Sequence, residues 1–447
     1  METQLQNFWN NNRLTFKGFT VGFLILVMLI PSVFVASLID ERKARQHEVI
    51  EEVSSKWASA QTVSGPFMVI PYKEQVTTSD GKTVTEKKWA TFLPEKLRVS
   101  GNLIPEARHR SIFTIMVYRS DIRIEGSFGP LALGSINLNK EDLILNEAYL
   151  CMGLSDFRGI ENALWIKWDG SSYAFNAGLP DDKSIHQGLS VPVNITTADL
   201  DKPHAYSMDM SLKGSEQLFF VPLGKTTEVQ MKSPWNKPAF GGNFLPDRPQ
   251  INDSGFIAGW KLLHLNRPYP QEWKDREYDL GSSAFGVKLL QSGDTYSKTE
   301  RSIKYSLLFI TMTFLLYFFI EILQKRKVHP LQYVLVGLAI IIFYTLLLSI
   351  SEYIGFNAGY TVAASATIIL ITAYTKSIFQ KWNIVAVFFI VLSVLYGFIF
   401  VLIQLEDGAL LFGSIGLFTI LGIVMYYSRK VEWYNRPVAL PVVPEET

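Results

Sequence analysis

Residues that could act as a nucleophile or bind phosphate occur in one short segment of this sequence. Residues 81–83, Gly-Lys-Thr, resemble the end of a phosphate-binding loop, but Val76 stands where that loop requires its first glycine. Ser79 and Lys82 have the spacing of a serine nucleophile and its lysine base, a pattern that works at the start of a helix. Here they surround an Asp-Gly pair, which is typical of a β-hairpin turn. The segment therefore predicts a hairpin and no catalytic residue.

Histidine and cysteine define no metal site in the sequence. Cys151 is the only cysteine, which excludes an intramolecular disulfide and a thiolate cluster, and we interpret it as a small buried apolar side chain. No two histidines have a spacing typical of metal ligands. We expect no catalytic residue, metal or cofactor, although a hydrolase whose groups meet only in three dimensions stays open. The six histidines are His47, His109, His186, His204, His264 and His329.

The distribution of charge divides the 447 residues into two parts. The chain holds 42 Lys or Arg and 41 Asp or Glu, a balance that argues against a nucleic-acid-binding surface. Residues 40–300 hold 30 basic and 33 acidic residues, whereas residues 301–447 hold 10 and 7. We expect the first of these regions to face water and the second to lie largely in a lipid bilayer.

Six apolar segments predict membrane-spanning helices. Residues 18–39 carry no charge and are long enough to cross a hydrocarbon core of about 30 Å. This segment is longer than the apolar part of a cleaved signal peptide, so we interpret it as a retained anchor that continues outward as a helical stalk over residues 40–60. The other five apolar segments are residues 305–323, 331–350, 361–374, 384–405 and 409–427.

Basic residues between the C-terminal segments predict the orientation of the chain. Positive charge marks the cytoplasmic side of a membrane protein, and here it lies in alternate connections and in the tail. The prediction is a cytoplasmic N-terminus (residues 1–17), an external region between the first helix and the rest (residues 40–300), a five-helix membrane region (residues 301–430) and a cytoplasmic tail (residues 431–447). The topology-determining residues are Lys325, Arg326, Lys327, Lys376, Lys381, Arg429 and Lys430.

Ionisable residues inside membrane segments would indicate a proton or ion pathway. The acidic residues of the C-terminal region fall near segment ends: Glu321, Glu352, Glu406 and Asp407. Glu321 lies four residues before Lys325, a spacing that favours an ion pair on the helix surface. Aromatic residues such as Tyr333 fall where interfacial anchors are expected. The segments therefore indicate helix packing and anchoring and not transport.

The external residues 61–300 predict a mainly β domain. Residues 204–212 alternate apolar and polar side chains, which is the pattern of a half-buried strand. Turn-forming dipeptides recur along the region and favour a sandwich- or barrel-like sheet. Residues 67–95 and 219–255 resemble each other, and either two related β units or unrelated strand, proline and turn combinations would explain this.

The order of one anchor, a large β region and a C-terminal helix cluster resembles the CreD family of bacterial inner-membrane proteins. The most specific stretch is KVHPLQYVLVGLAIIIFYTLLLSISEYIGF at residues 327–356, and the similarity covers nearly the whole chain. The positions that match the family pattern, which we expect to be structural, are Gly65, Pro66, Pro94, Arg158, Gly159, Pro246, Ser254, Gly255, His329, Pro330, Gln332, Tyr333, Gly337, Ser351, Glu352 and Gly355.

The resemblance implies a role in cell-envelope integrity or a stress response, with links to colicin tolerance, and it supplies no cofactor or catalytic residue. We therefore expect a non-enzymatic protein whose periplasmic β domain recognises another envelope component. The alternative is binding or transfer of a lipid-like molecule between the bilayer and the β domain, for which Trp235, Phe240, Trp260 and Trp273 are candidate contacts, although core packing is the commoner role of such residues. The expected partners are the bilayer and envelope proteins or lipids, and not nucleic acid.

Overall fold

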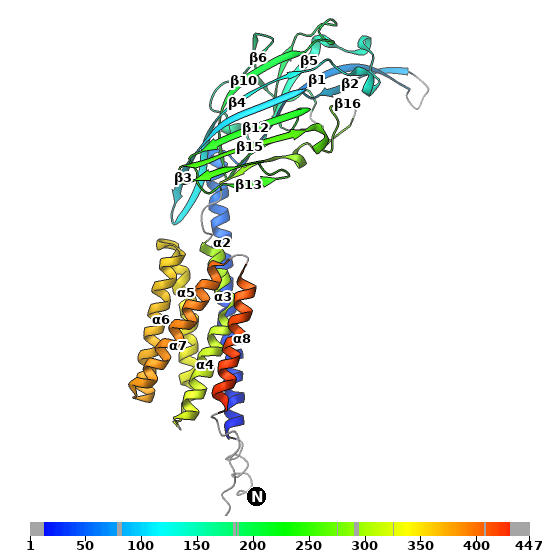
Figure 1. Ribbon diagram of the computed structural model, residues 1–447. Coiled ribbons are helices and arrows are strands. Elements are labelled where there is room, and N and C mark those ends of the chain that lie inside the picture. The colour runs from blue at the N-terminus through cyan, green and yellow to red at the C-terminus, as the bar shows by residue number, and fades with distance from the viewer. Residues whose placement is uncertain are drawn as a thin grey trace, which may run out of the picture. The chain divides into compact units, whose positions relative to one another are not determined.

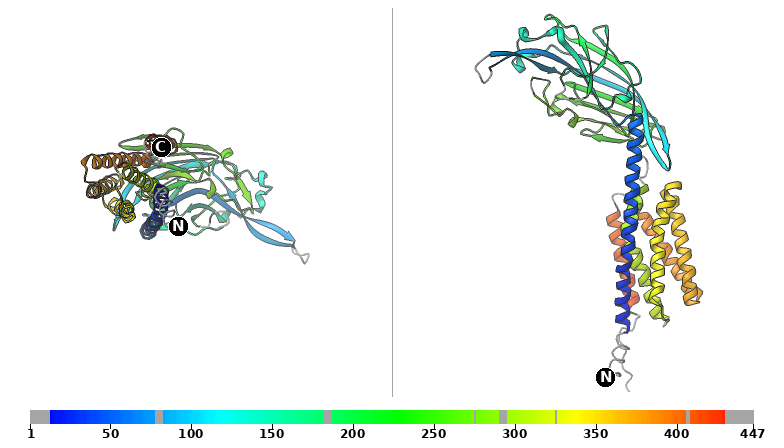
Figure 2. Two further views of the ribbon diagram at one scale, coloured as in Figure 1. Left: turned by 90° about the horizontal axis from the view of Figure 1, so that it is seen from below. Right: turned by 180° about the vertical axis from the view of Figure 1, so that it is seen from behind.

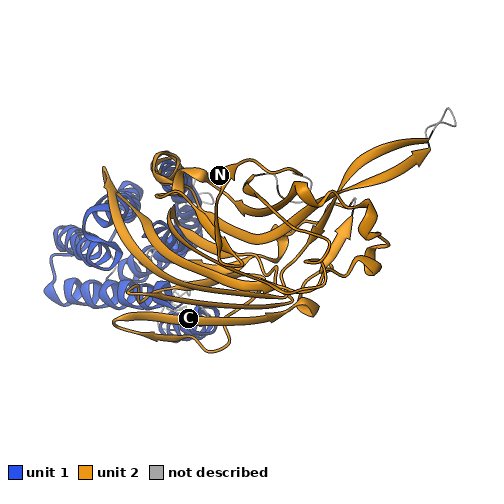
Figure 3. Cartoon of the chain, turned by 90° about the horizontal axis from the view of Figure 1, so that it is seen from above, with its two compact units in different colours: residues 1–45, 293–447 blue, residues 46–292 orange. Residues whose placement is uncertain are grey.

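The computed structural model describes residues 13–77, 83–181, 185, 187–274, 276–289, 295–324, 326–405 and 408–429. The chain divides into a helical unit, residues 1–45 and 293–447, and a β unit, residues 46–292 (Figure 3). The first boundary falls inside one helix, so the N-terminal helix contributes to both units.

Six helices within the described ranges are long and apolar enough to cross a membrane. The first, α2 (Arg13–Trp57), is a continuous helix of 45 residues that contains Pro31 (Figure 2). The other five correspond to the five C-terminal segments that the sequence predicts, and the third of these is longer than predicted at both ends. They are α4 (Ser306–Leu323), α5 (Pro330–Ile354), α6 (Phe356–Phe379), α7 (Trp382–Gln404) and α8 (Ala409–Ser428) (Figure 1).

A seventh helix, α3 (Thr295–Lys304), precedes α4 and was not predicted. It is amphipathic, with Tyr296, Thr299, Ser302 and Ile303 buried and charged residues on its other face. A search for apolar segments misses such a helix because half of its surface is polar.

Local chemistry fixes where α5 begins. His329 is its N-cap, and His329 Nδ1 accepts a hydrogen bond from the Leu331 amide at 3.2 Å. Gln332 Oε1 accepts a hydrogen bond from the His329 amide at 3.0 Å, which completes a capping box. Pro330 occupies the first helical position, where its missing N–H would lack an intrahelical partner anyway.

A single residue separates α5 from α6. Gly355 has φ +80° and ψ 162°, a conformation that favours glycine, and it lets the chain reverse without a longer loop. The two helices then approach closely, because a Cβ atom at Gly359 would lie 2.8 Å from the Ser351 Cα atom.

The β unit contains two sheets. The nine-stranded sheet has the order β13-β17-β11-β1-β5-β9-β8, with β2 paired to β1 and β16 paired to β2. Its strands are β1 (Gln61–Thr77), β2 (Thr83–Phe92), β5 (Ala148–Leu154), β8 (Asn176–Ala177), β9 (Gly188–Val193), β11 (Gln217–Phe220), β13 (Ala239–Gly242), β16 (Glu272–Lys274) and β17 (Phe285–Lys288).

The eight-stranded sheet has the order β14-β15-β12-β3-β4-β10-β6-β7, and several of its strands are labelled side by side in Figure 1. Its strands are β3 (Lys96–Arg110), β4 (Phe113–Phe128), β6 (Trp165–Trp168), β7 (Ser171–Ala174), β10 (His204–Ser215), β12 (Thr226–Ser233), β14 (Gln250–Asn252) and β15 (Gly255–Leu263). Short 3-10 helices lie at Leu133–Ile136, Lys140–Asp142, Leu145–Glu147, Phe157–Gly159, His264–Asn266 and Gly281–Ser283.

Two local predictions can be compared directly with these strands. The predicted hairpin is present, since β1 and β2 pair antiparallel as far as Thr77 and Thr83. Its turn, with Ser79 and Lys82, lies outside the described residues. The alternation predicted for residues 204–212 is also confirmed, since Tyr206, Met208, Met210 and Leu212 are buried in β10.

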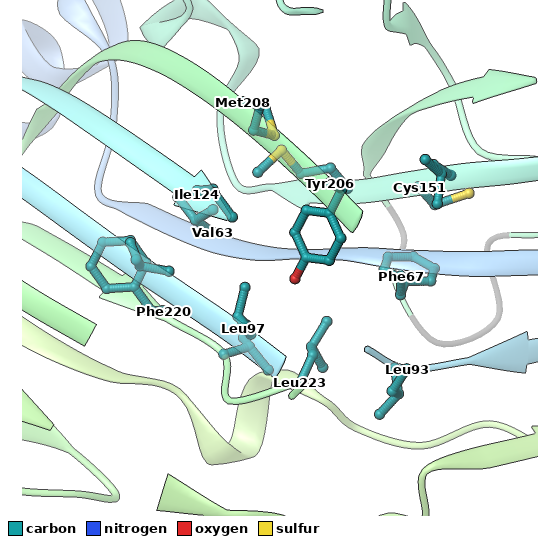
Figure 4. Close-up of a cluster of buried hydrophobic side chains, with 14 of the residues drawn as sticks. Val63, Phe67, Leu93, Leu97, Ile124, Cys151, Tyr206, Met208, Phe220 and Leu223 are labelled. Carbon is teal, nitrogen blue, oxygen red and sulfur yellow. The ribbon is translucent and has the colours of Figure 1, made fainter. Parts of the chain in front are cut away.

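The inner faces of the two sheets enclose one hydrophobic core (Figure 4). Phe67 and Phe220 from the nine-stranded sheet and Ile124 and Met208 from the eight-stranded sheet are among its members. Cys151 is fully buried there, and burial raises the pKa of its thiol well above the usual value. The thiol is therefore protonated and unreactive, as the interpretation of a small apolar side chain requires.

The two similar sequence stretches belong to this single core. The first stretch begins within β1 and the second within β11, and these two strands pair in parallel through residues 61–63 and 218–220. Their later parts differ, because residues 93–94 directly follow β2 whereas residues 244–246 lie between β13 and β14. Duplication of one β unit remains a hypothesis.

Candidate functional site

The outer face of the eight-stranded sheet, which points away from the core, is polar. In β3, Leu97 and Val99 are buried, whereas Arg98 and Ser100 are exposed. The same alternation in β4, β10 and β12 directs a set of polar side chains outward because successive side chains of a strand point to opposite faces. We call this surface the polar face.

Strand register arranges charges of alternating sign across the polar face. Arg98 lies opposite Glu228 on one side and Glu125 on the other. Its guanidinium nitrogens are 3.3 Å from Glu228 Oε2 and 3.5 Å from Glu125 Oε1. Lys261 Nζ lies 3.3 Å from Glu228 Oε1. Hydrogen bonds from Lys261 and then Arg98 hold the pKa of Glu228 below its usual value.

Arg123 connects this row of charges to the next one. Its Nε atom lies 3.4 Å from Glu125 Oε2, and its Nη1 atom lies 3.4 Å from Asp209 Oδ1. Ser100 is the cross-strand neighbour of Arg123, and Gln230 is the neighbour of Ser100, so the second row is less charged than the first. The Arg123 side chain is 55% exposed, which leaves it accessible to a partner.

Two hollows of about 580 and 730 Å³ lie on the polar face, and Arg123 lines both. Polar residues of the smaller hollow include Ser100, Asn102, Asp121, Asp209, Ser211 and Gln230. Polar residues of the larger hollow include Arg98, Glu125, Lys167, Ser207 and Glu228. These groups can donate and accept hydrogen bonds over an extended surface. An apolar ligand that bound over the charged groups would remove them from water, which costs free energy.

The family-pattern residues of the β unit do not line the two hollows. One of them, Arg158, forms a clamp with Asp156 on the end of α2. Asp156 accepts hydrogen bonds from the Ser59 amide and from Arg158 Nη2, each at 2.8 Å. Arg158 also donates to the carbonyl oxygen of Ser55 in the last turn of α2. Burial by itself would raise the pKa of Asp156, but the hydrogen bonds from Arg158 and Ser59 outweigh it and hold that pKa well below the usual value.

Close packing accounts for two glycines of the pattern. A Cβ atom at Gly159 would lie 2.4 Å from the Lys213 carbonyl oxygen. A Cβ atom at Gly255 would lie 2.0 Å from the Ser233 carbonyl oxygen, and Gly255 has φ +135°. Both positions need a residue without a side chain where two backbone segments meet.

The remaining pattern residues of the β unit lie in turns and connections. The Pro94 carbonyl accepts a hydrogen bond from Gln271 Nε2 at 2.7 Å, and the Ser254 amide donates to Asn252 Oδ1 at 3.0 Å. Gly65 and Pro66 are joined by a cis peptide bond within β1, and Pro246 lies between β13 and β14. The structure does not bring these residues together into one site.

In the helical unit, Glu321 is buried, which corrects the expectation that it lies on the helix surface. Glu321 is 5% exposed and accepts hydrogen bonds from the Val328 amide at 2.7 Å and from the Tyr333 hydroxyl at 3.0 Å. It also forms an ion pair with Lys17 of α2. Lys325, the predicted partner, lies outside the described residues.

The same contacts correct the assignment of Tyr333 as an interfacial anchor, because Tyr333 is buried against Glu321. No local sequence pattern could reveal this cluster, since Lys17 and Glu321 are 304 residues apart. The sequence had singled out Tyr333 as a family-pattern position and Glu321 as an acidic residue near a segment end, but it did not connect them.

Glu352 forms a second cluster at the other end of α5. Its Oε1 atom accepts a hydrogen bond from the Tyr296 hydroxyl at 3.0 Å and lies 3.9 Å from Arg42 Nε. The cluster therefore joins α2, α3 and α5. Gly337 allows α2 to approach the middle of α5, because a Cβ atom there would lie 2.7 Å from Met28 Sδ.

Three of the residues that were predicted to determine the topology have contacts in the described part of the chain. Lys381 Nζ donates to Gln324 Oε1 at 2.7 Å, Lys376 Nζ lies 4.0 Å from the centre of the Trp382 ring, and Arg429 lies over Tyr426. Arg326 and Lys327 are exposed, and Lys430 lies outside the described residues.

One apolar N-terminal helix, a two-sheet β unit and five further apolar helices define a multi-pass membrane protein with a β unit inserted after its first helix. The model of the family described as inner membrane protein CreD matches residues 13–434, and the chain belongs to this family. The chain is also 30% identical over 417 residues to the inner membrane protein CreD of Escherichia coli (strain K12), covering 92% of this chain and 91% of the relative.

The family assignment confirms the resemblance that the sequence motifs indicated. It makes the chain a multi-pass inner-membrane protein whose apolar helices lie in a lipid bilayer. Neither matched name states an enzymatic activity.

Proposed function

We propose that this protein is a non-enzymatic component of the cell envelope that holds its β unit in the periplasm and recognises an envelope protein through the polar face. The observation that carries the proposal is the pair of adjacent hollows on that face, both lined by Arg123. Their charges occur in both signs, so the partner is expected to present a polar segment that also carries both signs.

The ion pairs on the polar face are weak enough for a partner protein to replace them. Its ion pairs, such as Arg123 with Asp209, join exposed groups, and an exposed pair of this kind contributes about 0–1 kcal/mol to stability. A partner can replace these internal contacts with its own at low cost. The β strands around them hold the side chains in a fixed order.

The periplasmic location rests on the positive charge between the C-terminal helices. With six crossings, and with Lys376, Lys381 and the basic tail on the cytoplasmic side, both termini would lie in the cytoplasm and residues 40–300 outside. The polar face would then meet components of the periplasm and the outer surface of the inner membrane.

The described part of the β unit favours a polar partner over a lipid-like ligand. Trp260 and Trp273 are buried in the core, and Trp235 and Phe240 pack against it. The aromatics that could have contacted a lipid are therefore occupied by core packing. The larger hollow on the polar face is lined mainly by charged and hydroxyl groups, which an acyl chain would leave desolvated. The smaller hollow combines such groups with Ile122, Leu164 and Ile257.

Site-specific photocrosslinking in intact cells tests the proposal. A crosslinking amino acid at Gln230, on the polar face, is expected to give a discrete protein complex that disappears when Arg123→Ala is added. The matched control position is Asn176, an exposed residue at the edge of the other sheet. Equal capture from both positions, or capture of lipid alone from Gln230, would contradict the proposal.

A further inference from the structure

The interior of the helical unit contains hydroxyl groups that its packing does not explain. Five buried hydroxyls have no hydrogen-bond partner among the described residues: Ser302, Thr313, Tyr344, Thr372 and Tyr396. A buried polar group without a partner costs free energy, and native proteins satisfy nearly all such groups. These five lie on five different helices, α3, α4, α5, α6 and α7.

On α4, polar residues follow the helical repeat along one face. Thr313, Tyr317 and Glu321 are spaced four residues apart and are all buried. Tyr317 forms a 2.5 Å hydrogen bond with Thr375 of α6, whose neighbour one turn away is Thr372. Polar groups therefore continue from Glu321 toward the middle of the helix.

One turn of α4 beyond Thr313 lies the apolar ring of Phe309, and tyrosines of the neighbouring helices lie next to it. The ring of Phe309 on α4 lies 6.1 Å from the ring of Tyr344 and 4.4 Å from that of Tyr396. The Tyr360 hydroxyl donates to the Tyr396 carbonyl oxygen at 2.8 Å. Three tyrosines from α5, α6 and α7 thus surround the part of α4 that lies beyond Thr313.

Carboxylates stand at the two ends of the line. Glu321 lies near the end of α4, and α5 starts at Pro330 after a short connection, so the two helices run antiparallel. Glu352 lies 22 residues after Pro330, which at about 1.5 Å per residue places it about 33 Å along α5. That length is close to the thickness of a bilayer core.

We propose that this interior is a proton path, made of the buried hydroxyls and internal water molecules, that connects Glu321 with Glu352. Water is the ligand that satisfies unpartnered hydroxyls, since a buried water typically makes two to four hydrogen bonds to such groups. Proton relays use ionisable side chains that face the interior of a helix bundle, and the burial of Glu321, which the sequence did not indicate, provides such a group.

The transfer conserves atoms and charge. A proton binds one carboxylate, each hydroxyl or water along the path accepts a proton on its oxygen and passes its own proton onward, and a proton leaves from the other carboxylate. One positive charge crosses the membrane, and no other bond is formed or broken.

Proton flux into liposomes tests the path. Full-length protein is reconstituted with an enclosed pH-sensitive dye, and a potassium diffusion potential drives protons inward. The flux is expected to exceed that of protein-free liposomes and to fall about tenfold in Glu321→Gln, because a relay loses its terminal acceptor. A flux no greater than that of protein-free liposomes would overturn the proposal.

A matched pair of threonines on α6 separates the path from general effects of mutation. Thr372 is buried without a partner, whereas Thr361 is exposed and bonds only to the Asn357 carbonyl of its own helix. Thr372→Val is expected to lower the flux several-fold and Thr361→Val to leave it unchanged. Equal flux in the two variants would contradict the path, provided that both elute as folded protein.

Hydration of the interior can be measured without any substitution. X-ray radiolysis in ¹⁸O-labelled water marks side chains that lie next to ordered internal water. Tyr344 and Tyr396 are expected to incorporate the label although they are buried. Failure of both to incorporate it would mean that the interior is dry, and the proposal would then fail whatever role the β unit has.

Discussion

Charged side chains have opposite environments in the two units of this protein. In the β unit, Arg98 and Arg123 stand on an outer face with exposed partners on adjacent strands. In the helical unit, Glu321 points inward and accepts hydrogen bonds from α5, from the segment before it and from α2. An exposed pair contributes little to stability, whereas removal of one member of a buried pair is strongly destabilising. Exposed charge can therefore serve recognition, and buried charge holds helices together.

The largest effect is expected at the buried carboxylate. Glu321→Gln leaves Lys17 without a counter-charge and is expected to lower the free energy of unfolding by about 3 kcal/mol, toward the lower end for buried pairs because Lys17 is 28% exposed. Thermal unfolding of the full chain in detergent, followed by helical circular dichroism, measures it. Lys304→Gln, which breaks an exposed pair on α3, is the control and is expected to change stability little.

A smaller effect is expected at the clamp between Asp156 and Arg158. Asp156→Asn removes a carboxylate with charge-assisted hydrogen bonds and is expected to cost about 2 kcal/mol near pH 7. Because folding lowers the pKa of Asp156, the stabilisation is present above the unfolded-state value of about 3.9 and is lost as pH falls through the folded-state pKa.

The difference between wild type and Asp156→Asn should therefore shrink when the pH is lowered from 6 toward 2. Urea unfolding followed by tryptophan fluorescence measures the difference at each pH. A difference that is constant over this range would show that the Asp156 charge does not contribute to the clamp.

The smallest effect on stability is expected on the polar face. Arg98→Ala removes exposed ion pairs and is expected to change the free energy of unfolding by less than about 0.5 kcal/mol. It should nevertheless weaken capture of a partner from Gln230. A loss of stability comparable to that of Glu321→Gln would remove the contrast between the two units.

The sequence predicts the features that depend on local pattern. Uninterrupted apolar length predicts the six spans, and the alternation in residues 204–212 predicts β10 and its buried face. Positions such as Gly355 and His329 take roles that follow from glycine geometry and helix capping. These features need only neighbours along the chain.

Features that depend on distant residues were not predictable from the pattern. The polar face exists only because β3, β4, β10 and β12 pair in one register, which sets Arg98 beside Glu228. Glu321 meets Lys17 because α2 packs against helices that follow it by about 300 residues. A search for long apolar segments misses the amphipathic helix α3.

Cysteine labelling tests most directly the central claim, that the polar face is exposed outside the cytoplasm. Cys151 is buried, so Gln230→Cys adds the one accessible thiol among the described residues, and Lys327→Cys provides a control on the side expected to be cytoplasmic. A maleimide that crosses the outer but not the inner membrane is expected to label Gln230→Cys in intact cells and Lys327→Cys only after the inner membrane is opened. Labelling in the reverse order would contradict the account.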